Sequence, residues 1–113
     1  MTNTKTQLTE TVKQTLAKIS SYKGVSNNLS DLVMNFRLLL LYVNHFDFEE
    51  IQEWISVYDM QSHMSVRGYL VACSAHPSTL PIEEEKYFEK EMKILQNFVE
   101  YVRDNIDSFK STE

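Results

Sequence analysis

Apolar side chains in the last third of the chain recur at alternating steps of four and three residues. The series consists of Phe88, Met92, Leu95, Val99, Val102, Ile106 and Phe109. This spacing places every member on one face of an α-helix, and a regular run of this length is typical of a helix that packs against other helices. The apolar run from Leu38 to Val43 offers a surface to pack against. The sequence therefore predicts an all-α fold: a helical bundle of about four to five helices with a long C-terminal amphipathic helix.

Length and composition are consistent with one helical domain. The chain has 113 residues, so we expect 1–113 to form a single helical-bundle domain, with frayed ends at 1–5 and 110–113. Two glycines and two prolines leave little material for β-hairpins. The single cysteine, Cys73, cannot form an internal disulfide, and no apolar run is long enough for a membrane span or a secretory signal. These features predict a cytoplasmic protein without membrane contact.

Amphipathic patterns predict three of the other helices. The first is expected to end near Gly24, with an apolar face formed by Leu8, Val12, Leu16 and Ile19. Another is expected after Asp47, which suits an N-cap position, and its inward residues are Ile51, Trp54, Ile55 and Tyr58. A further helix is expected over 64–75, with Val66, Tyr69, Leu70 and Cys73 inward.

Two of the expected helices have more than one apolar side. The helix over 32–46 is apolar on most sides, which predicts that it is buried all round at the centre of the bundle. The C-terminal helix is expected to start at Ser78 or Thr79 and to span about 29 residues, roughly 43 Å. Beside its main seam it carries a second apolar flank of Tyr87, Ile94, Phe98 and Tyr101. This flank fits either insertion between two neighbouring helices or self-association into a homodimer.

Charge is distributed unevenly along the chain. The net charge is −5, made up of +3 over residues 1–45 and −8 over residues 46–113. Because affinity for nucleic acid grows with the number of phosphates neutralised, the acidic part argues against a nucleic-acid-binding protein. It permits a partner protein with a basic surface. Alternatively, these carboxylates only solvate helix faces.

The residues that could carry chemistry do not form a catalytic or metal-binding set. His45 stands close to Asp47, Glu49 and Glu50, but no second histidine follows at helical spacing, so these residues are interpreted as a helix cap and no metal is expected. Cys73 lies in an apolar run and is interpreted as a small buried residue. No glycine-rich phosphate loop is present. The sequence therefore predicts no catalytic residue, no cofactor and no enzymatic activity.

Arg37 followed by His45 resembles the arginine-to-histidine motif of the HEPN-type ribonucleases, which are also helical bundles. The resemblance covers about a dozen residues, and the spacing here is longer than in that family. It implies an RNA-cleaving activity that depends on Arg37. From the residues alone, Arg37 is instead interpreted as a side chain whose aliphatic stem packs on the bundle.

The favoured hypothesis is a small non-catalytic protein-binding helical protein, such as an adaptor, chaperone, inhibitor or immunity-like regulator. It would act through an acidic and aromatic surface of its C-terminal part, where aromatic side chains anchor a partner and carboxylates steer a basic one. The candidate partner-binding residues are Trp54, Tyr58, Glu83, Glu84, Glu85, Tyr87, Glu91 and Tyr101. The alternative is a dimeric nucleic-acid-binding regulator that would use Lys5, Lys13, Lys18 and Lys23.

Overall fold

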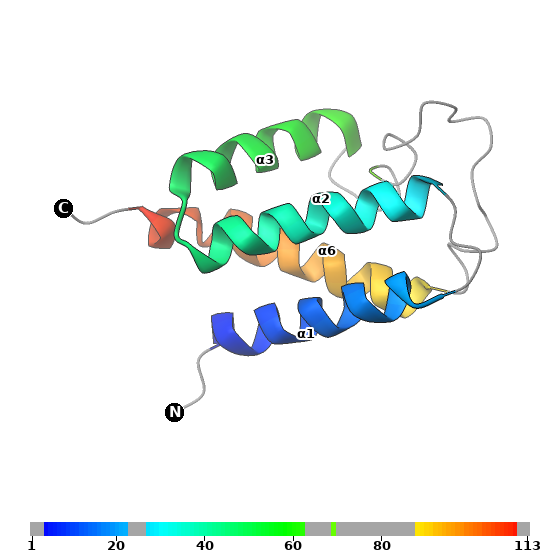
Figure 1. The fold of residues 1–113 in the computed structure, drawn as a ribbon. Helices are drawn as coiled ribbons and strands as arrows, with labels where there is room; N and C mark the ends of the chain where they lie inside the picture. Colours follow the sequence, from blue (N-terminus) through cyan, green and yellow to red (C-terminus); the bar gives the residue numbers. More distant parts are fainter. Residues whose placement is uncertain (1–3, 23–26, 63–68, 70–87, 111–113) are drawn as a thin grey trace.

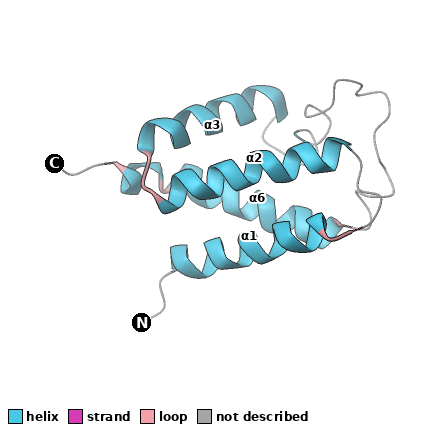
Figure 2. Cartoon of the chain, in the orientation of Figure 1, coloured by secondary structure: helices cyan, strands magenta, loops and turns pink. Residues whose placement is uncertain are grey.

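The computed structural model describes residues 4–22, 27–62, 69 and 88–110 of the chain. Its α-helices are α1 (Thr4–Ser20), α2 (Asn27–Asn44), α3 (Phe48–Ser62) and α6 (Glu89–Asp104), followed by the 3-10 helix η2 (Ile106–Phe109). In Figure 1, α2 and α6 lie between α1 and α3, and the regular elements in Figure 2 are all helical. The prediction of an all-α bundle is confirmed. The helix expected over 64–75 falls outside the described residues, except for Tyr69, which is buried as predicted.

Helix α1 packs through the apolar face that the sequence predicts. Val12, Leu16 and Ile19 are fully buried and Leu8 packs at the edge of the core. After Ser20 the backbone N–H groups of Ser21 and Tyr22 donate to carbonyls of the last turn, so the helix ends close to the predicted position. The helix begins at Thr4, inside the segment that was expected to fray.

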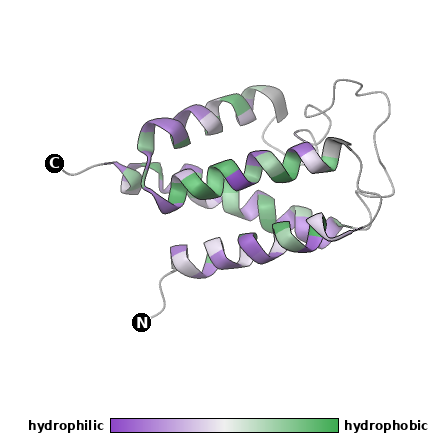
Figure 3. Ribbon diagram, in the orientation of Figure 1, coloured by the Kyte–Doolittle hydropathy of each residue, from purple (hydrophilic) through white to green (hydrophobic). Residues whose placement is uncertain are grey.

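Helix α2 is covered on one side only, so the prediction that it is buried all round is wrong. Its inward residues are Leu29, Leu32, Val33, Phe36, Leu39, Leu40 and Val43. Met34, Leu38 and Leu41 on the other side are 59%, 40% and 48% exposed. A bundle covers only the inward face of each helix, so a helix that is apolar on most sides leaves part of its apolar surface in water. The ribbon of α2 accordingly shows hydrophobic colour on much of its length (Figure 3).

The C-terminal helix is shorter than predicted, although its apolar seam is confirmed. Helix α6 begins at Glu89 and has 16 residues, in place of the expected 29 or so. The preceding Phe88 has non-helical angles (φ −103°, ψ 24°) and its ring packs edge-on against Tyr22, 5.2 Å between centroids. Beyond Asp104 the chain tightens into η2, which keeps Phe109 fully buried. The proposed caps Ser78 and Thr79 lie outside the described residues.

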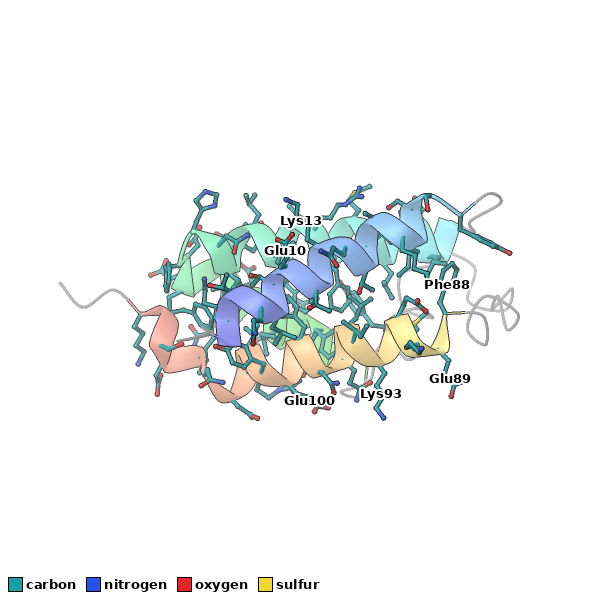
Figure 4. All side chains as sticks on the ribbon, turned by 90° about the horizontal axis from the view of Figure 1, so that it is seen from below. Glu10, Lys13, Phe88, Glu89, Lys93 and Glu100 are labelled. Atoms are coloured by element: carbon teal, nitrogen blue, oxygen red, sulfur yellow. The ribbon has the colours of Figure 1, made fainter. Side chains whose placement is uncertain are left out.

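The second flank of α6 packs within the chain where the structure describes it. Phe98 is fully buried, and Ile94 and Tyr101 are partly buried against the core. Figure 4 shows the opposite edge of this helix, where the exposed residues Glu89, Lys93 and Glu100 lie. Packing between neighbouring helices of the same chain, the first of the two alternatives, therefore accounts for these three apolar residues.

The turn between α2 and α3 is a Schellman motif with an unusual central residue. The N–H of Asp47 donates to the carbonyl of Tyr42 and the N–H of Phe46 to that of Val43, which is the hydrogen-bond pattern of this motif. Its left-handed position, usually glycine, is occupied by Phe46 with φ 52°. Helix α3 then begins at Phe48, directly after Asp47, as the sequence predicts.

Candidate functional site

A cavity of about 300 Å³ opens between α2 and α3, and we call it the α2–α3 groove. The described residues that line it are Asn35, Tyr42, Glu50, Glu53, Trp54, Val57 and Tyr69. Residues three, four or seven apart share one face of a helix, which explains why Asn35 and Tyr42 line it together from α2. The same spacing brings Glu50, Trp54 and Val57 to the groove from α3. Two helix faces therefore converge on one opening.

Aromatic rings form a fixed wall of the groove. The indole N–H of Trp54 donates to the backbone carbonyl of Asn35 at 3.0 Å, which holds the indole against α2. The Trp54 ring stacks on Tyr58 at 5.4 Å between centroids and meets Phe36 edge-on at 5.2 Å. The ring of Tyr69 lies 5.5 Å from Trp54. With its indole N–H bonded and one ring stacked on it, Trp54 is held in one orientation at the groove.

Two carboxylates stand at the groove without a cation from the described chain. Glu50 and Glu53 are both exposed. The ion pairs among the described residues join Lys18 to Glu91, Arg103 to Asp59 and Lys110 to Asp107, so none of them neutralises Glu50 or Glu53. Glu50 lies in the first turn of α3, where the helix dipole favours negative charge. Glu53 lies beyond that turn, so the helix dipole gives no reason for a negative charge at this position.

Exposed apolar side chains flank the groove. Seven large apolar residues are exposed among the described residues, and five of them lie on α2 and α3: Met34, Leu38, Leu41, Val57 and Met60. Leu38 shares the groove-facing side of α2, because it lies three residues after Asn35 and four before Tyr42. Met34 and Leu41 are its neighbours along the same helix. The two helices that form the groove therefore carry most of the exposed large apolar residues among the described ones.

The predicted partner-binding residues that the structure describes are scattered, and among these only Trp54 lines the groove. Tyr58 is 1% exposed and belongs to the core, and Tyr101 is partly buried against it. Neither tyrosine is therefore an exposed anchor. Glu83, Glu84, Glu85 and Tyr87 lie outside the described residues.

Glu91 is part of an internal ion pair. Its side chain is 7% exposed and accepts a hydrogen bond from the Lys18 ammonium at 2.6 Å, which links α6 to α1. The Lys18 hydrogen bond lowers the pKa of Glu91 below its ordinary value of 4.5, against the opposing effect of burial. A carboxylate held in this way stabilises the bundle and is not placed to steer a partner.

The lysines and the other motif residues have their own contacts. The Lys5 ammonium lies 4.7 Å from the centre of the Phe46 ring, and Lys23 is outside the described residues. The Arg37 guanidinium donates to the hydroxyl of Ser20 at 3.0 Å, and the His45 ring nitrogen Nδ1 lies 3.0 Å from the Leu41 carbonyl oxygen. Within the described ranges, no group of three or more His, Cys, Asp or Glu residues could hold a metal ion.

Sequence reasoning missed most of the groove. Tyr42 was part of an apolar run that predicted burial, and Glu50 was interpreted only as a cap residue. The signal that could have found the groove is the three- and four-residue spacing of Glu50, Glu53 and Val57 around Trp54. Asn35 and Tyr69 carry no comparable signal, because they reach the groove through the packing of separate segments.

Comparison of the chain with protein-family models, with curated proteins and with solved structures found no match. The helices of the described segments are too short or too polar to span a membrane. The groove itself is therefore the observation from which a function can be argued.

Proposed function

We propose that this chain is a small, non-catalytic protein-binding domain that receives a helical segment of a partner protein in the α2–α3 groove. The observation that carries the proposal is a groove lined by aromatic rings between two helices that together carry five exposed large apolar residues. Exposed apolar side chains gathered on one part of a molecule are typical of an interaction site.

The shape of the surface favours a helix as the bound element. From Met34 to Leu41 the exposed apolar residues extend about 10 Å along α2, given a rise of 1.5 Å per residue. An amphipathic helix can lay side chains of successive turns along such a line while one of them enters the groove. Trp54 supplies the type of anchor that dominates interface energies.

The cavity alone is a weaker candidate for a small-molecule site. Its volume of about 300 Å³ is at the lower limit for ligand pockets, and residues that line it are exposed. Among the described residues that line it there is no serine, threonine, cysteine or histidine, and its two carboxylates are exposed. These features support binding over catalysis.

A library of helical peptides displayed on phage and selected on the purified protein tests the proposal. We expect the selected peptides to lose at least about tenfold in affinity to Leu38→Glu and to Val57→Glu, because each places a charge on the apolar surface. The control Gln14→Glu adds the same charge on the exposed face of α1 and should bind like the original chain.

Isothermal titration calorimetry gives the affinities, and thermal unfolding of each variant verifies that the fold is intact. Peptides that bind both groove variants and the control equally well would place binding elsewhere and contradict the proposal. A selection that yields no peptide above background would contradict it as well.

A further inference from the structure

We infer that the α2–α3 groove holds an arginine side chain of the partner protein, with its guanidinium between the aromatic wall and the carboxylates of Glu50 and Glu53. This inference rests on the proposed function and specifies the chemistry of the bound residue. It is carried by the combination of three aromatic rings, two carboxylates and a small cavity in one place.

The aromatic rings favour a cation that can stack. Tyr42, Trp54 and Tyr69 all line the cavity. An aromatic face attracts a cation electrostatically, and a planar guanidinium also stacks on it, which a tetrahedral ammonium cannot do. The same chain uses this interaction internally, since the Lys5 ammonium lies over Phe46 and the Lys110 ammonium over Phe48.

The carboxylates supply the complementary charge. Elsewhere among the described residues, Glu91 and Asp59 are each paired with a basic side chain of another helix. Glu50 and Glu53 have no such ion pair within the described ranges, although they lie one turn apart on the same helix. Two neighbouring carboxylates repel each other slightly, and a guanidinium with five N–H donors can bond to both.

The size of the cavity fits one side chain. A volume of about 300 Å³ is at the low end of the range that encloses a drug-sized molecule. An arginine side chain is smaller, and its aliphatic stem can pass Val57 and Leu38 while its charged end reaches the carboxylates. The apolar residues thus suit the aliphatic stem of an arginine, and the carboxylates of Glu50 and Glu53 suit its guanidinium.

Fluorescence titration tests this inference directly, because Trp54 is the single tryptophan of the chain and lines the cavity. The probe is N-acetyl-arginine amide, and its matched control is N-acetyl-citrulline amide, which has the same shape without the charge. We expect a saturable change of Trp54 emission with the arginine probe and none with the citrulline probe.

The double variant Glu50→Gln, Glu53→Gln should weaken the arginine probe by about tenfold, because both carboxylate charges are removed. The control variant Glu10→Gln, Glu100→Gln removes two exposed carboxylates from α1 and α6 and should leave the titration unchanged (Figure 4). An equal response to citrulline, an unaffected Glu50→Gln, Glu53→Gln variant, or no saturable response to arginine would overturn the inference.

These outcomes are distinguishable from failure of the proposed function. If the protein binds selected helices at the groove but does not respond to the arginine probe, the proposed function stands and the arginine inference is wrong. If the protein binds the arginine probe but no helical peptide, the groove is a cation site and the proposed protein-binding function is wrong.

Discussion

The seam between α1 and α6 and the seam between α2 and α3 are held together in different ways. At the first, the Lys18 ammonium bonds to the buried Glu91 carboxylate, and Phe88 covers the end with its ring against Tyr22. At the second, aromatic rings line an open cavity, and the carboxylates of Glu50 and Glu53 line it as well. At the first seam the carboxylate is paired with a cation of the same chain. At the second seam no cation among the described residues is paired with Glu50 or Glu53. This difference is the reason for proposing that a partner binds at the second seam.

Substitution of Phe36 should have the largest effect, because this ring is the buried base of the α2–α3 seam. It is fully buried and packs against Trp54, Tyr58 and Tyr69. We expect Phe36→Ala to lower the free energy of unfolding by about 3–5 kcal/mol. Leu38→Ala, two residues along on the exposed side, should change it by less than about 0.5 kcal/mol. Urea denaturation measures both, and equal losses would show that the outer side of α2 is covered after all.

The ion pair between Asp59 on α3 and Arg103 on α6 is the next largest contribution. Both side chains are partly buried, and the Nε atom of Arg103 has no hydrogen-bond partner among the described residues. We expect Asp59→Ala to cost about 1–3 kcal/mol, because it leaves a partly buried guanidinium unpaired. Arg103→Met should cost less, since it removes the charge that needs a partner. If the two variants are equally destabilised in chemical denaturation, the pair contributes in another way.

The pair that closes the α1–α6 seam should make stability depend on pH. The folded pKa of Glu91 is lowered, so its contribution is present above the unfolded value near 4.5 and is lost as pH falls through the folded pKa. We expect Glu91→Gln to be less stable by roughly 1–2 kcal/mol at neutral pH and to converge with the original chain in acid. Thermal unfolding over a pH series measures the difference, with Glu10→Gln as the exposed control. A difference that does not depend on pH would contradict the assignment.

The smallest effect on stability is expected at the groove edge. The double variant Glu50→Gln, Glu53→Gln should change the free energy of unfolding by no more than about 0.5–1 kcal/mol, because the lost dipole interaction of Glu50 is offset by relief of repulsion. Chemical denaturation provides the measurement. A large loss would mean that these carboxylates hold the fold together and would weaken the contrast between the two seams.

Periodicity predicted the inward faces of the helices well, because side-chain spacing follows directly from helix geometry. Spacing predicted Val12, Leu16 and Ile19 of α1 and Ile51, Ile55 and Tyr58 of α3, all of which are buried, as well as Leu8, which is partly buried. The start of α6 at Glu89 was not predicted, because Phe88 continues the apolar spacing although its backbone is not helical. The spacing of apolar residues reports where side chains lie and carries no information on the backbone angles of each residue.

Spacing places the α3 residues of the groove on one helix face, but the groove as a whole could not be predicted from it, because the cavity depends on how separate segments meet. Asn35 offers a backbone carbonyl to Trp54, and every residue has such a carbonyl. Glu91 was expected to be exposed by its charge, yet a lysine on α1 lies within bonding distance. Pairing across helices is a property of the packed chain, so a linear pattern does not contain it.

The left-handed Phe46 links the two ends of the described chain to the opening of the groove. Its ring contacts Phe109 of η2 at 5.8 Å between centroids and lies beneath the ammonium of Lys5 on α1. A left-handed phenylalanine is disfavoured by its side chain, so these contacts help to hold the turn in place. That turn joins α2 to α3, so Lys5 and Phe109 support the connection between the two helices of the groove although neither is among its described lining residues.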